Sequence, residues 1–182
     1  SVIERLKEEL KKIEEDARDM AKKLNKETED ILRRARKLAR ELEKHLEDVK
    51  RKIDELIKED KKSEEVVKEV KKELDRNNEE SKRVVEEVRR RLDESNKKSR
   101  EVAEDVKRLL DEILEKVRRG PVDKKMIEEV ERDVRRIKKE VDRLLEENTE
   151  RIEEIKKEVD ELLKRNTDEV EKVKKKVDED RK

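Results

Sequence analysis

The sequence predicts an all-α fold, an extended helical hairpin of one very long helix and one shorter helix that assembles into a straight multi-helix bundle. Three observations support this prediction. Charged residues make up 62% of the chain and hydrophobic residues 29%, and aromatic residues are absent. The Leu, Ile and Val residues recur at helical spacing, which disordered chains of similar charge lack. The single Gly and the single Pro are adjacent, so one strong helix breaker divides the chain.

The charge composition excludes several classes of function. Basic and acidic residues number 56 each and alternate finely, so no block of like charge indicates a nucleic-acid tail or a polybasic membrane patch. Apolar runs never exceed two residues, which is too short for a transmembrane helix. Cysteine is absent, which excludes disulfides and thiolate metal sites. We expect a soluble protein without nucleic-acid or membrane partners. Its localisation is unknown, because no targeting segment is recognised, and a start at Ser1 in place of Met would fit a recombinant product.

The stretch RRGPVDKK around Gly120 and Pro121 predicts the end of one helix and the start of another. A Gly that follows a helix can adopt the left-handed capping conformation, and a following Pro cannot continue the helix. The two arginines before the Gly would place positive charge in the last turn, where the helix dipole favours it. The sequence therefore predicts a first helix over residues 2–119, a turn at 119–122 and a second helix over residues 122–182.

An 18-residue repeat runs through both predicted helices. Leu74, Leu92 and Leu110 are 18 residues apart, and Val141 and Val159 repeat with the same spacing in the second helix. Eighteen residues complete five turns of an α-helix. A seven-residue repeat favours a left-handed supercoil and an 11-residue repeat a right-handed one, so their sum predicts nearly straight helices.

The register of the polar residues predicts that residues 61–182 form an antiparallel hairpin. Facing residues of such a hairpin have numbers with a constant sum. Asn166 with Asn77, and Asn148 with Ser95, both sum to 243, which places polar residues opposite polar residues. The hydrophobic stripe covers about 120° of the helix surface, which is wider than the seam of a two-stranded coiled coil and predicts a bundle of four or more helices.

Residues 1–60 have no partner within such a hairpin. We expect them to form a single-helix N-terminal overhang that packs against other copies in an intermolecular bundle. Their hydrophobic stripe is rotated by about 60° from that of the following residues, which predicts different neighbours. Four alanines on it would permit close helix approach: Ala17, Ala21, Ala35 and Ala39. The alternative is a helix break near KEDKKSEE, where Ser63 could act as an N-cap.

Ten polar residues lie on the hydrophobic stripe and form the candidate site, a set of layers that specify assembly. They are Asn77, Asn78, Ser81, Ser95, Asn96, Ser99, Asn148, Thr149, Asn166 and Thr167. A buried polar group is costly unless it is hydrogen-bonded, and matched layers can satisfy one another while penalising wrong partners. We interpret the ten residues as buried hydrogen-bond networks. Partly hydrated positions that keep the stripe soluble, and a polar axial channel, are the alternatives.

No pattern indicates a catalytic, cofactor-binding or metal site, and we expect no cofactor and no enzymatic activity. His45 is the sole histidine, and a di-iron bundle would need Glu where Leu42 stands, three residues earlier. We expect His45 to lie in a polar layer or at an edge; a ring of symmetry-related histidines acting as a pH switch or metal ligand is the alternative. Met20 and Met126 fit the apolar stripe and are predicted to fill the core.

The 18-residue repeats, the single Gly-Pro connection and the Asn/Ser/Thr layers at matched heights make the chain resemble de novo designed, parametrically generated helical bundles. The resemblance covers the whole chain and implies a self-assembling, rod- or axle-like homo-oligomeric scaffold without natural biochemical activity. The expected partners are copies of itself, as a trimer or a hexamer of two trimers. Dimers, tetramers and a second designed component stay open. The alternative function is a natural coiled-coil adaptor or spacer that binds other helices.

Overall fold

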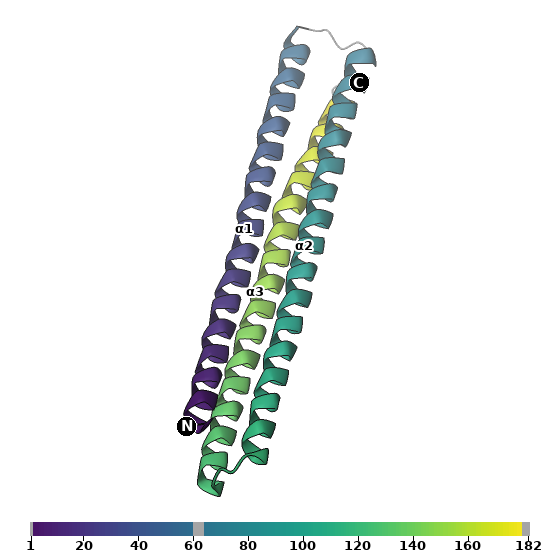
Figure 1. Cartoon of the computed structure of the whole chain (residues 1–182). Coiled ribbons are helices and arrows are strands. Elements are labelled where there is room, and N and C mark those ends of the chain that lie inside the picture. Colours follow the sequence, from purple (N-terminus) through teal and green to yellow (C-terminus); the bar gives the residue numbers. More distant parts are fainter. Residues whose placement is uncertain (1, 60–63, 180–182) are drawn as a thin grey trace. The chain divides into compact units, whose positions relative to one another are not determined.

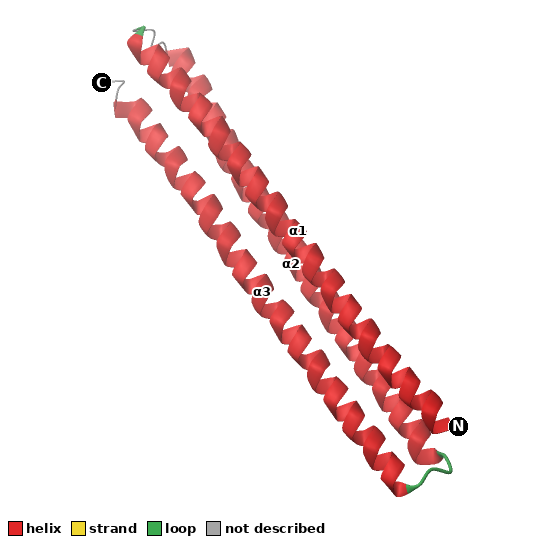
Figure 2. Cartoon of the chain, turned by 90° about the vertical axis from the view of Figure 1, so that its left-hand side faces the viewer, coloured by secondary structure: helices red, strands yellow, loops and turns green. Residues whose placement is uncertain are grey.

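A computed structural model describes residues 2–59 and 64–179 and contains three long helices (Figure 1). They are α1 (Val2–Lys58), α2 (Glu64–Arg119) and α3 (Lys124–Glu179), with 57, 56 and 56 residues. Figure 2, coloured by secondary structure, shows the same helices. Glu, Lys, Arg and Leu favour helix, and apolar residues recur every three or four positions, so each helix has one apolar face.

The all-α class predicted from the sequence is confirmed, but the extended hairpin of one very long and one shorter helix is wrong. α1 ends at Lys58 and α2 begins at Glu64, so residues 2–119 are not one helix. The break lies near KEDKKSEE, the alternative that the sequence leaves open. Ser63, the possible N-cap, and the expected domain boundary at residues 60–61 lie outside the described residues.

The break explains why the hydrophobic stripe rotates between α1 and α2. One continuous helix would turn the two stripes in different directions, whereas two separate helices can each turn a stripe toward a common core. Leu6 and Leu10 of α1 pack in one core with residues of α2 and α3, and Leu46 and Val49 pack in another. α1 therefore finds its neighbours within the chain and is not an unpartnered overhang.

The connection between α2 and α3 lies at the predicted Gly-Pro break, but its caps differ from the expectation. The Gly120 N–H donates to the carbonyls of Lys116 (3.2 Å) and Val117 (3.3 Å), which closes the last turn of α2. Gly120 does not adopt the left-handed conformation expected of a capping glycine. The carboxylate of Asp123 accepts a hydrogen bond from the Met126 N–H at 3.0 Å, so Asp123 caps the start of α3.

The chain divides into two compact units, and each contains a segment of all three helices. Unit 1 comprises Ser1–Glu29 and Leu92–Glu153, and unit 2 comprises Asp30–Arg91 and Glu154–Lys182. In unit 1, the N-terminal end of α1 lies near the connection between α2 and α3 (Figures 1 and 2). Each unit is a three-helix bundle with its own core.

Both cores are aliphatic and take side chains from all three helices. The buried core of unit 1 includes the cluster Leu6, Leu10, Ala17, Ala103, Leu110, Ile113, Val117, Val130, Val134, Ile137 and Val141. The buried core of unit 2 includes the cluster Leu46, Val49, Ile53, Val67, Val70, Leu74, Val170, Val173 and Val177. Fully burying one Val, Leu or Ile side chain contributes about 1.5–3 kcal/mol, so these cores supply the main stabilisation of each unit.

Ion pairs at the helix edges define how the helices run. The residue numbers of α1–α3 pairs differ by 122 in unit 1 (Lys7–Glu129, Arg18–Glu140, Glu14–Arg136) and in unit 2 (Arg36–Glu158, Asp54–Lys176). One pair of unit 2, Lys50–Glu169, differs by 119, which is about one helical turn less. The residue numbers of α2–α3 pairs sum to 249 in unit 1 (Arg118–Glu131, Asp111–Lys138) and in unit 2 (Arg89–Asp160, Lys71–Asp178). A constant difference indicates parallel helices and a constant sum antiparallel ones. In each unit, α3 therefore runs parallel to α1 and antiparallel to α2.

Candidate functional site: the buried polar layers

In unit 2, Asn77 of α2 lies at the centre of a polar layer to which all three helices contribute. Its Oδ1 accepts a hydrogen bond from Asn166 Nδ2 of α3 at 2.6 Å, and its Nδ2 donates to the Leu42 carbonyl of α1 at 3.1 Å. The same Nδ2 lies 3.1 Å from His45 Nδ1. Asn77 and Asn166 are both buried. The structure thus brings together the two asparagines that the constant sum of 243 places opposite each other.

The other predicted residues of unit 2 make weaker or local contacts. Ser81 Oγ lies 3.5 Å from the Leu163 carbonyl, at the limit of a hydrogen bond. The Thr167 hydroxyl donates to the same carbonyl at 3.1 Å, one turn earlier in its own helix. Asn78 is half-buried, and its Oδ1 has no hydrogen-bond partner. The contact between helices in this layer therefore depends on Asn77 and Asn166.

Unit 1 contains the other five predicted residues in a second layer between α2 and α3. Asn148 Nδ2 donates to Ser99 Oγ at 3.0 Å, and Thr149 Oγ1 donates to Asn96 Oδ1 at 3.2 Å. Asn148 therefore bonds one turn of α2 away from Ser95, the partner that the constant sum of 243 predicts. The Oγ of Ser95 is buried without a hydrogen-bond partner.

Neither layer satisfies all of its polar atoms within the chain. The buried atoms without a partner are Asn78 Oδ1, Ser95 Oγ, Asn148 Oδ1 and Asn166 Oδ1. An unsatisfied buried polar group costs about 1–3 kcal/mol, so these positions lower the stability of the chain below that of an all-apolar core. By this measure the layers do not add to the stability of the chain.

Sequence reasoning misses Thr28, which is fully buried in unit 1. Its hydroxyl donates to the Asn25 carbonyl at 2.8 Å, so α1 itself satisfies the hydroxyl. The signal that could have identified it is the repeat, because Thr28 stands 18 residues after Leu10 and 18 before Leu46, which are both core positions. Thr28 adds a buried polar residue from α1 to unit 1.

Glu14 of α1 is a second missed residue, a carboxylate that is only 8% exposed at the α1–α3 edge of unit 1. Arg136 donates to both of its oxygens, at 2.8 Å and 3.1 Å, and Arg18 donates to Oε1 at 2.8 Å. The hydrogen bonds from Arg136 hold the pKa of Glu14 below its ordinary value of 4.5, and the positive charges of Arg136 and Arg18 act in the same direction, although burial opposes them.

Replacing Glu14 with Gln is expected to lower the free energy of unfolding by about 1–2 kcal/mol at neutral pH, because a charge-assisted bidentate contact is lost. The folded state lowers the pKa of this group, so its contribution is present above the unfolded value near 4.5 and fades as pH falls through the folded pKa. Urea denaturation should therefore show a smaller wild-type advantage at about pH 3 than at pH 7. Glu9→Gln, at an exposed position of the same helix, is the matched control. An E14Q deficit that persists unchanged at low pH would contradict the assignment.

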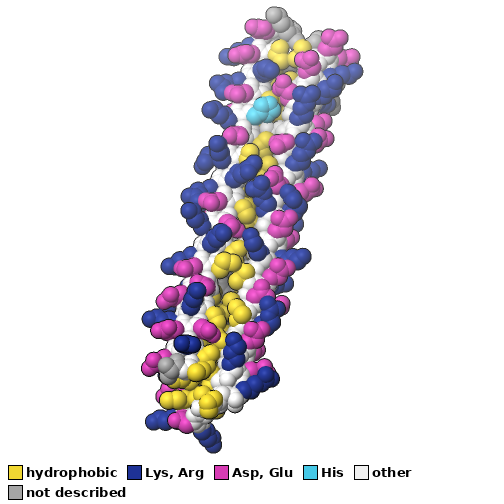
Figure 3. Space-filling model, in the orientation of Figure 1, with side chains coloured by type: hydrophobic (Ala, Val, Ile, Leu, Met, Phe, Trp, Pro, Cys, Tyr) yellow, Lys and Arg dark blue, Asp and Glu magenta, His cyan; other side chains and the backbone are white. Residues whose placement is uncertain are grey.

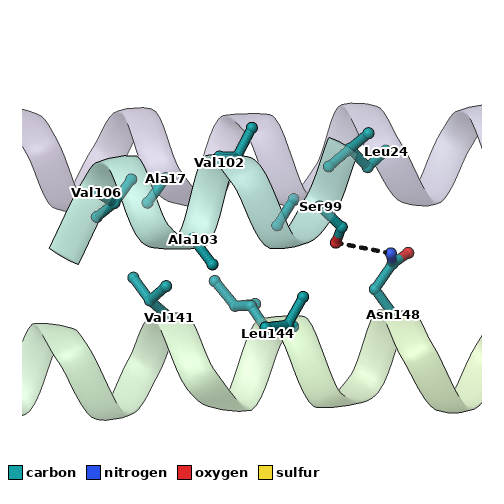
Figure 4. A pocket seen from close by; sticks show the side chains of 11 residues that line it. Ala17, Leu24, Ser99, Val102, Ala103, Val106, Val141, Leu144 and Asn148 are labelled. Carbon is teal, nitrogen blue, oxygen red and sulfur yellow. Dashed lines mark hydrogen bonds between the residues drawn. The ribbon is translucent and has the colours of Figure 1, made fainter. Parts of the chain in front are cut away.

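A cavity of about 30 Å³ lies beside the polar layer of unit 1 (Figure 4). Ala17, Ala21 and Ala103 line it, because their small side chains leave space that larger aliphatic residues would fill. Figure 4 shows Ser99 and Asn148 pointing toward each other at its edge, joined by their hydrogen bond. The cavity has room for a water molecule but not for an organic substrate.

A groove of about 560 Å³ lies between α1 and α3 in unit 2. Ala39, Leu46, Leu162 and Asn166 line it together with five basic and five acidic side chains. This balance of charge selects neither an anion nor a cation, so the groove indicates no class of substrate. Within residues 2–59 and 64–179, no group of three or more metal-ligating side chains could hold an ion. No helix in that part of the chain is long and apolar enough to cross a membrane.

The fold is a three-helix bundle. No protein-family model and no curated protein matches the sequence. A solved structure described as a computationally designed three helix bundle is similar to this chain, with a TM-score of 0.64 over 98% of this chain and 90% of that chain. The two sequences are 20% identical, so the likeness shows the fold alone.

The sequence predicts that the two methionines of this three-helix bundle fill the core, but both are exposed. Met20 is 36% exposed and Met126 is 38% exposed, and Leu109 of α2 is 43% exposed. Met20 and Leu109 both belong to unit 1. Single exposed hydrophobic residues are ordinary on a protein surface, so their meaning depends on whether they lie together.

Proposed function

We propose that the chain is a designed structural protein, a scaffold that holds three helices in fixed register and presents them to other helices, without enzymatic activity. The observation that carries this proposal is the constancy of the register. Ion pairs between α1 and α3 keep the same difference of 122 in both units, except Lys50–Glu169 of unit 2, whose difference is 119. Those between α2 and α3 keep the same sum of 249 in both. Such regularity is what a backbone generated by one repeated geometric rule would give.

Two further observations support a designed origin. The 18-residue repeat places identical residue types at Leu74, Leu92 and Leu110, all of which are fully buried. The structure that is similar to this chain in fold is itself described as computationally designed. The chemistry available in the polar layers is hydrogen bonding between helices, which suits assembly and does not suit catalysis.

The reason for expecting a trimer or a hexamer from the sequence does not hold in this fold. The trimer, and the hexamer of two trimers, follow from residues 1–60 having no partner in the chain, and α1 has such partners. We therefore propose that the free chain is a monomer with the mass of 22.1 kDa given by its composition. Light scattering over a range of concentrations measures this directly, and a mass of two or more chains in dilute solution would contradict it.

We expect thermal unfolding above about 90 °C, because idealised backbones with consistent capping and packing are typically hyperstable. Far-UV circular dichroism during heating, and a guanidinium titration with a midpoint expected above about 5 M, are the measurements. A cooperative transition at about 45–65 °C, the range of ordinary natural domains, would count against a designed scaffold and favour a natural helix-binding adaptor.

A further inference from the structure

The three edges of unit 1, where two helices meet at the surface, differ in how they use their charges. The α1–α3 and α2–α3 edges are lined by ion pairs between helices, such as Lys7–Glu129 and Arg118–Glu131. On the third edge, charged side chains of α1 and α2 make no ion pair with any described residue. They include Glu9, Asp16 and Lys23 of α1, and Lys98 and Glu112 of α2.

Helical geometry places these residues on the α1–α2 edge. At 100° per residue, Glu9 and Asp16 lie about 90° from the line of core residues on α1, on the side opposite Lys7 and Arg18, which face α3. On α2, Lys98 lies on the side opposite the residues that pair with α3, by the same count. We call this surface the α1–α2 edge of unit 1.

The same edge carries the exposed apolar side chains. Met20 of α1 and Leu109 of α2 are 36% and 43% exposed, and Ile13 and Val102 beside them are half-buried. Figure 3 shows hydrophobic side chains reaching the surface on this face, between rows of charged residues. Four apolar side chains from two adjacent helices therefore form one continuous strip that no described segment covers.

Charges of the same sign lie on the two sides of the strip at the same level, which means at the same height along the helix axes. The cavity of unit 1 is lined by Ala17, Ala21 and Leu24 of α1 and by Ser99, Val102, Ala103 and Val106 of α2. The middle of the first set lies near residue 21 and that of the second near residue 102, so we take residue numbers at one level to sum to about 123.

Within two residues of that sum, three levels follow along the strip: Glu9 with Glu112, Asp16 with Asp105, and Lys23 with Lys98. Of these six residues, only Asp105 makes an ion pair with a described residue, Arg108 of its own helix at 3.0 Å. Successive levels are seven residues apart on both helices. The strip is thus flanked by negative, negative and positive charge in turn.

We propose that the α1–α2 edge of unit 1 is the docking site for one amphipathic helix of a partner chain. Its apolar face would cover Met20 and Leu109. Its two flanks would carry Lys or Arg at the first two levels and Glu or Asp at the third, spaced by seven residues. This spacing matches two turns of a helix, and edge charges of this kind determine partner choice in helical bundles. The assignment rests on the proposed scaffold function and names its partner.

The charges disfavour a second copy of this chain as the occupant. If two copies paired through this edge with their levels aligned, α1 of one would lie against α2 of the other. Glu9 would then meet Glu112, and Lys23 would meet Lys98, so each level would oppose like charges. If two copies paired antiparallel and centred on Asp16, α1 would lie against α1, so Glu9 would meet Lys23 but Asp16 would meet Asp16. On α2, Asp105 would likewise meet Asp105. A separate helix with the complementary pattern pairs all three levels on both flanks.

The test uses two synthetic helical peptides of about four heptads with identical apolar positions. The complementary peptide carries Lys, Lys and Glu at the three levels on both flanks, and the reversed peptide carries Glu, Glu and Lys. Each is made in both sequence directions, because a helix can dock on the strip either parallel or antiparallel to α1. A single Trp in the peptide reports binding without interference, because the protein contains no Trp, Tyr or Phe.

We expect the complementary peptide to bind at least about tenfold more tightly than the reversed peptide, with a preference that shrinks at high salt. Leu109→Glu and Met20→Glu should each abolish binding while leaving the helical content unchanged. Met126→Glu, an exposed methionine on α3 in the same unit, is the matched control and should bind normally. Lys23→Glu combined with Lys98→Glu should weaken the complementary peptide.

Several results would overturn the proposal. They are binding of neither peptide, equal binding of both, or an equal loss of binding in L109E and M126E. Self-association of the free chain that L109E abolishes would instead identify a second copy as the occupant. These outcomes are separable from failure of the scaffold proposal, which is judged by the unfolding temperature and does not depend on any peptide.

Discussion

Leu110→Asp is expected to unfold unit 1 under conditions in which the wild-type chain is fully folded, whereas Leu109→Asp should leave it folded. The two leucines are adjacent, but Leu110 is 0% exposed and Leu109 is 43% exposed. A carboxylate at position 110 would replace a core side chain and be buried without a partner, at a cost of at least about 4 kcal/mol. At position 109 the same carboxylate would reach water. Urea denaturation followed by circular dichroism measures the difference.

Two milder substitutions make the comparison quantitative. Leu110→Ala should cost about 2–5 kcal/mol, as expected when a fully buried leucine is truncated. Leu109→Ala should change the free energy of unfolding by no more than about 0.5 kcal/mol. If L109D proved as damaging as L110D, α2 would have to turn a different face toward the core. The three-helix arrangement of unit 1 would then be wrong.

Each helix boundary was predictable only where the sequence contains a residue that disfavours helix. RRGPVDKK contains Gly120 and Pro121, and the chain leaves its helix there. KEDKKSEE contains good helix formers, so local preference alone extends the first helix through a point where the structure has two helices. The rotated stripe of α1 was the better signal. A helix that changes its buried face without a change of neighbours indicates a break, because separate helices can rotate independently.

The polar layers were predictable as positions but not as contacts. Asn77 and Asn166 meet as the constant sum predicts, whereas Asn148 bonds Ser99 instead of Ser95. Residue numbers place side chains only to within about one turn, and the reach of an Asn amide decides the partner within that range. Thr28 was missed because its hydroxyl bonds its own helix, which no pairing rule between helices can detect.

The width of the hydrophobic stripe predicted more neighbours than one chain supplies. A stripe of about 120° indicates four or more helices, and each unit contains segments of three. The partner helix proposed for the α1–α2 edge of unit 1 would add a fourth helix beside Met20 and Leu109.

Asn77→Ala is expected to destabilise the chain by about 2–4 kcal/mol, far more than its loss of volume would suggest. Asn77 is 2% exposed, and its Oδ1 is the acceptor for Asn166 Nδ2. Asn166 Oδ1 is already without a partner, so the substitution would leave the whole Asn166 amide buried and unsatisfied. Denaturant titration of the wild type, each single variant and the double variant measures the cost.

The double variant Asn77→Leu with Asn166→Leu should recover most of that loss and could exceed the wild type in stability, because replacing both partners leaves no orphaned amide between α2 and α3. In a double-mutant cycle whose single variants are Asn77→Leu and Asn166→Leu, the coupling between the two sites is therefore expected to be about 1–3 kcal/mol. Additive losses would mean that the Asn77–Asn166 hydrogen bond contributes nothing.

With the amides removed, nothing polar distinguishes this level of unit 2 from an ordinary aliphatic layer. Hydrogen exchange in the variant should therefore show faster opening around residues 77 and 166 even where the free energy of unfolding has risen, since selection among pairings and stability are separate properties of a buried polar pair.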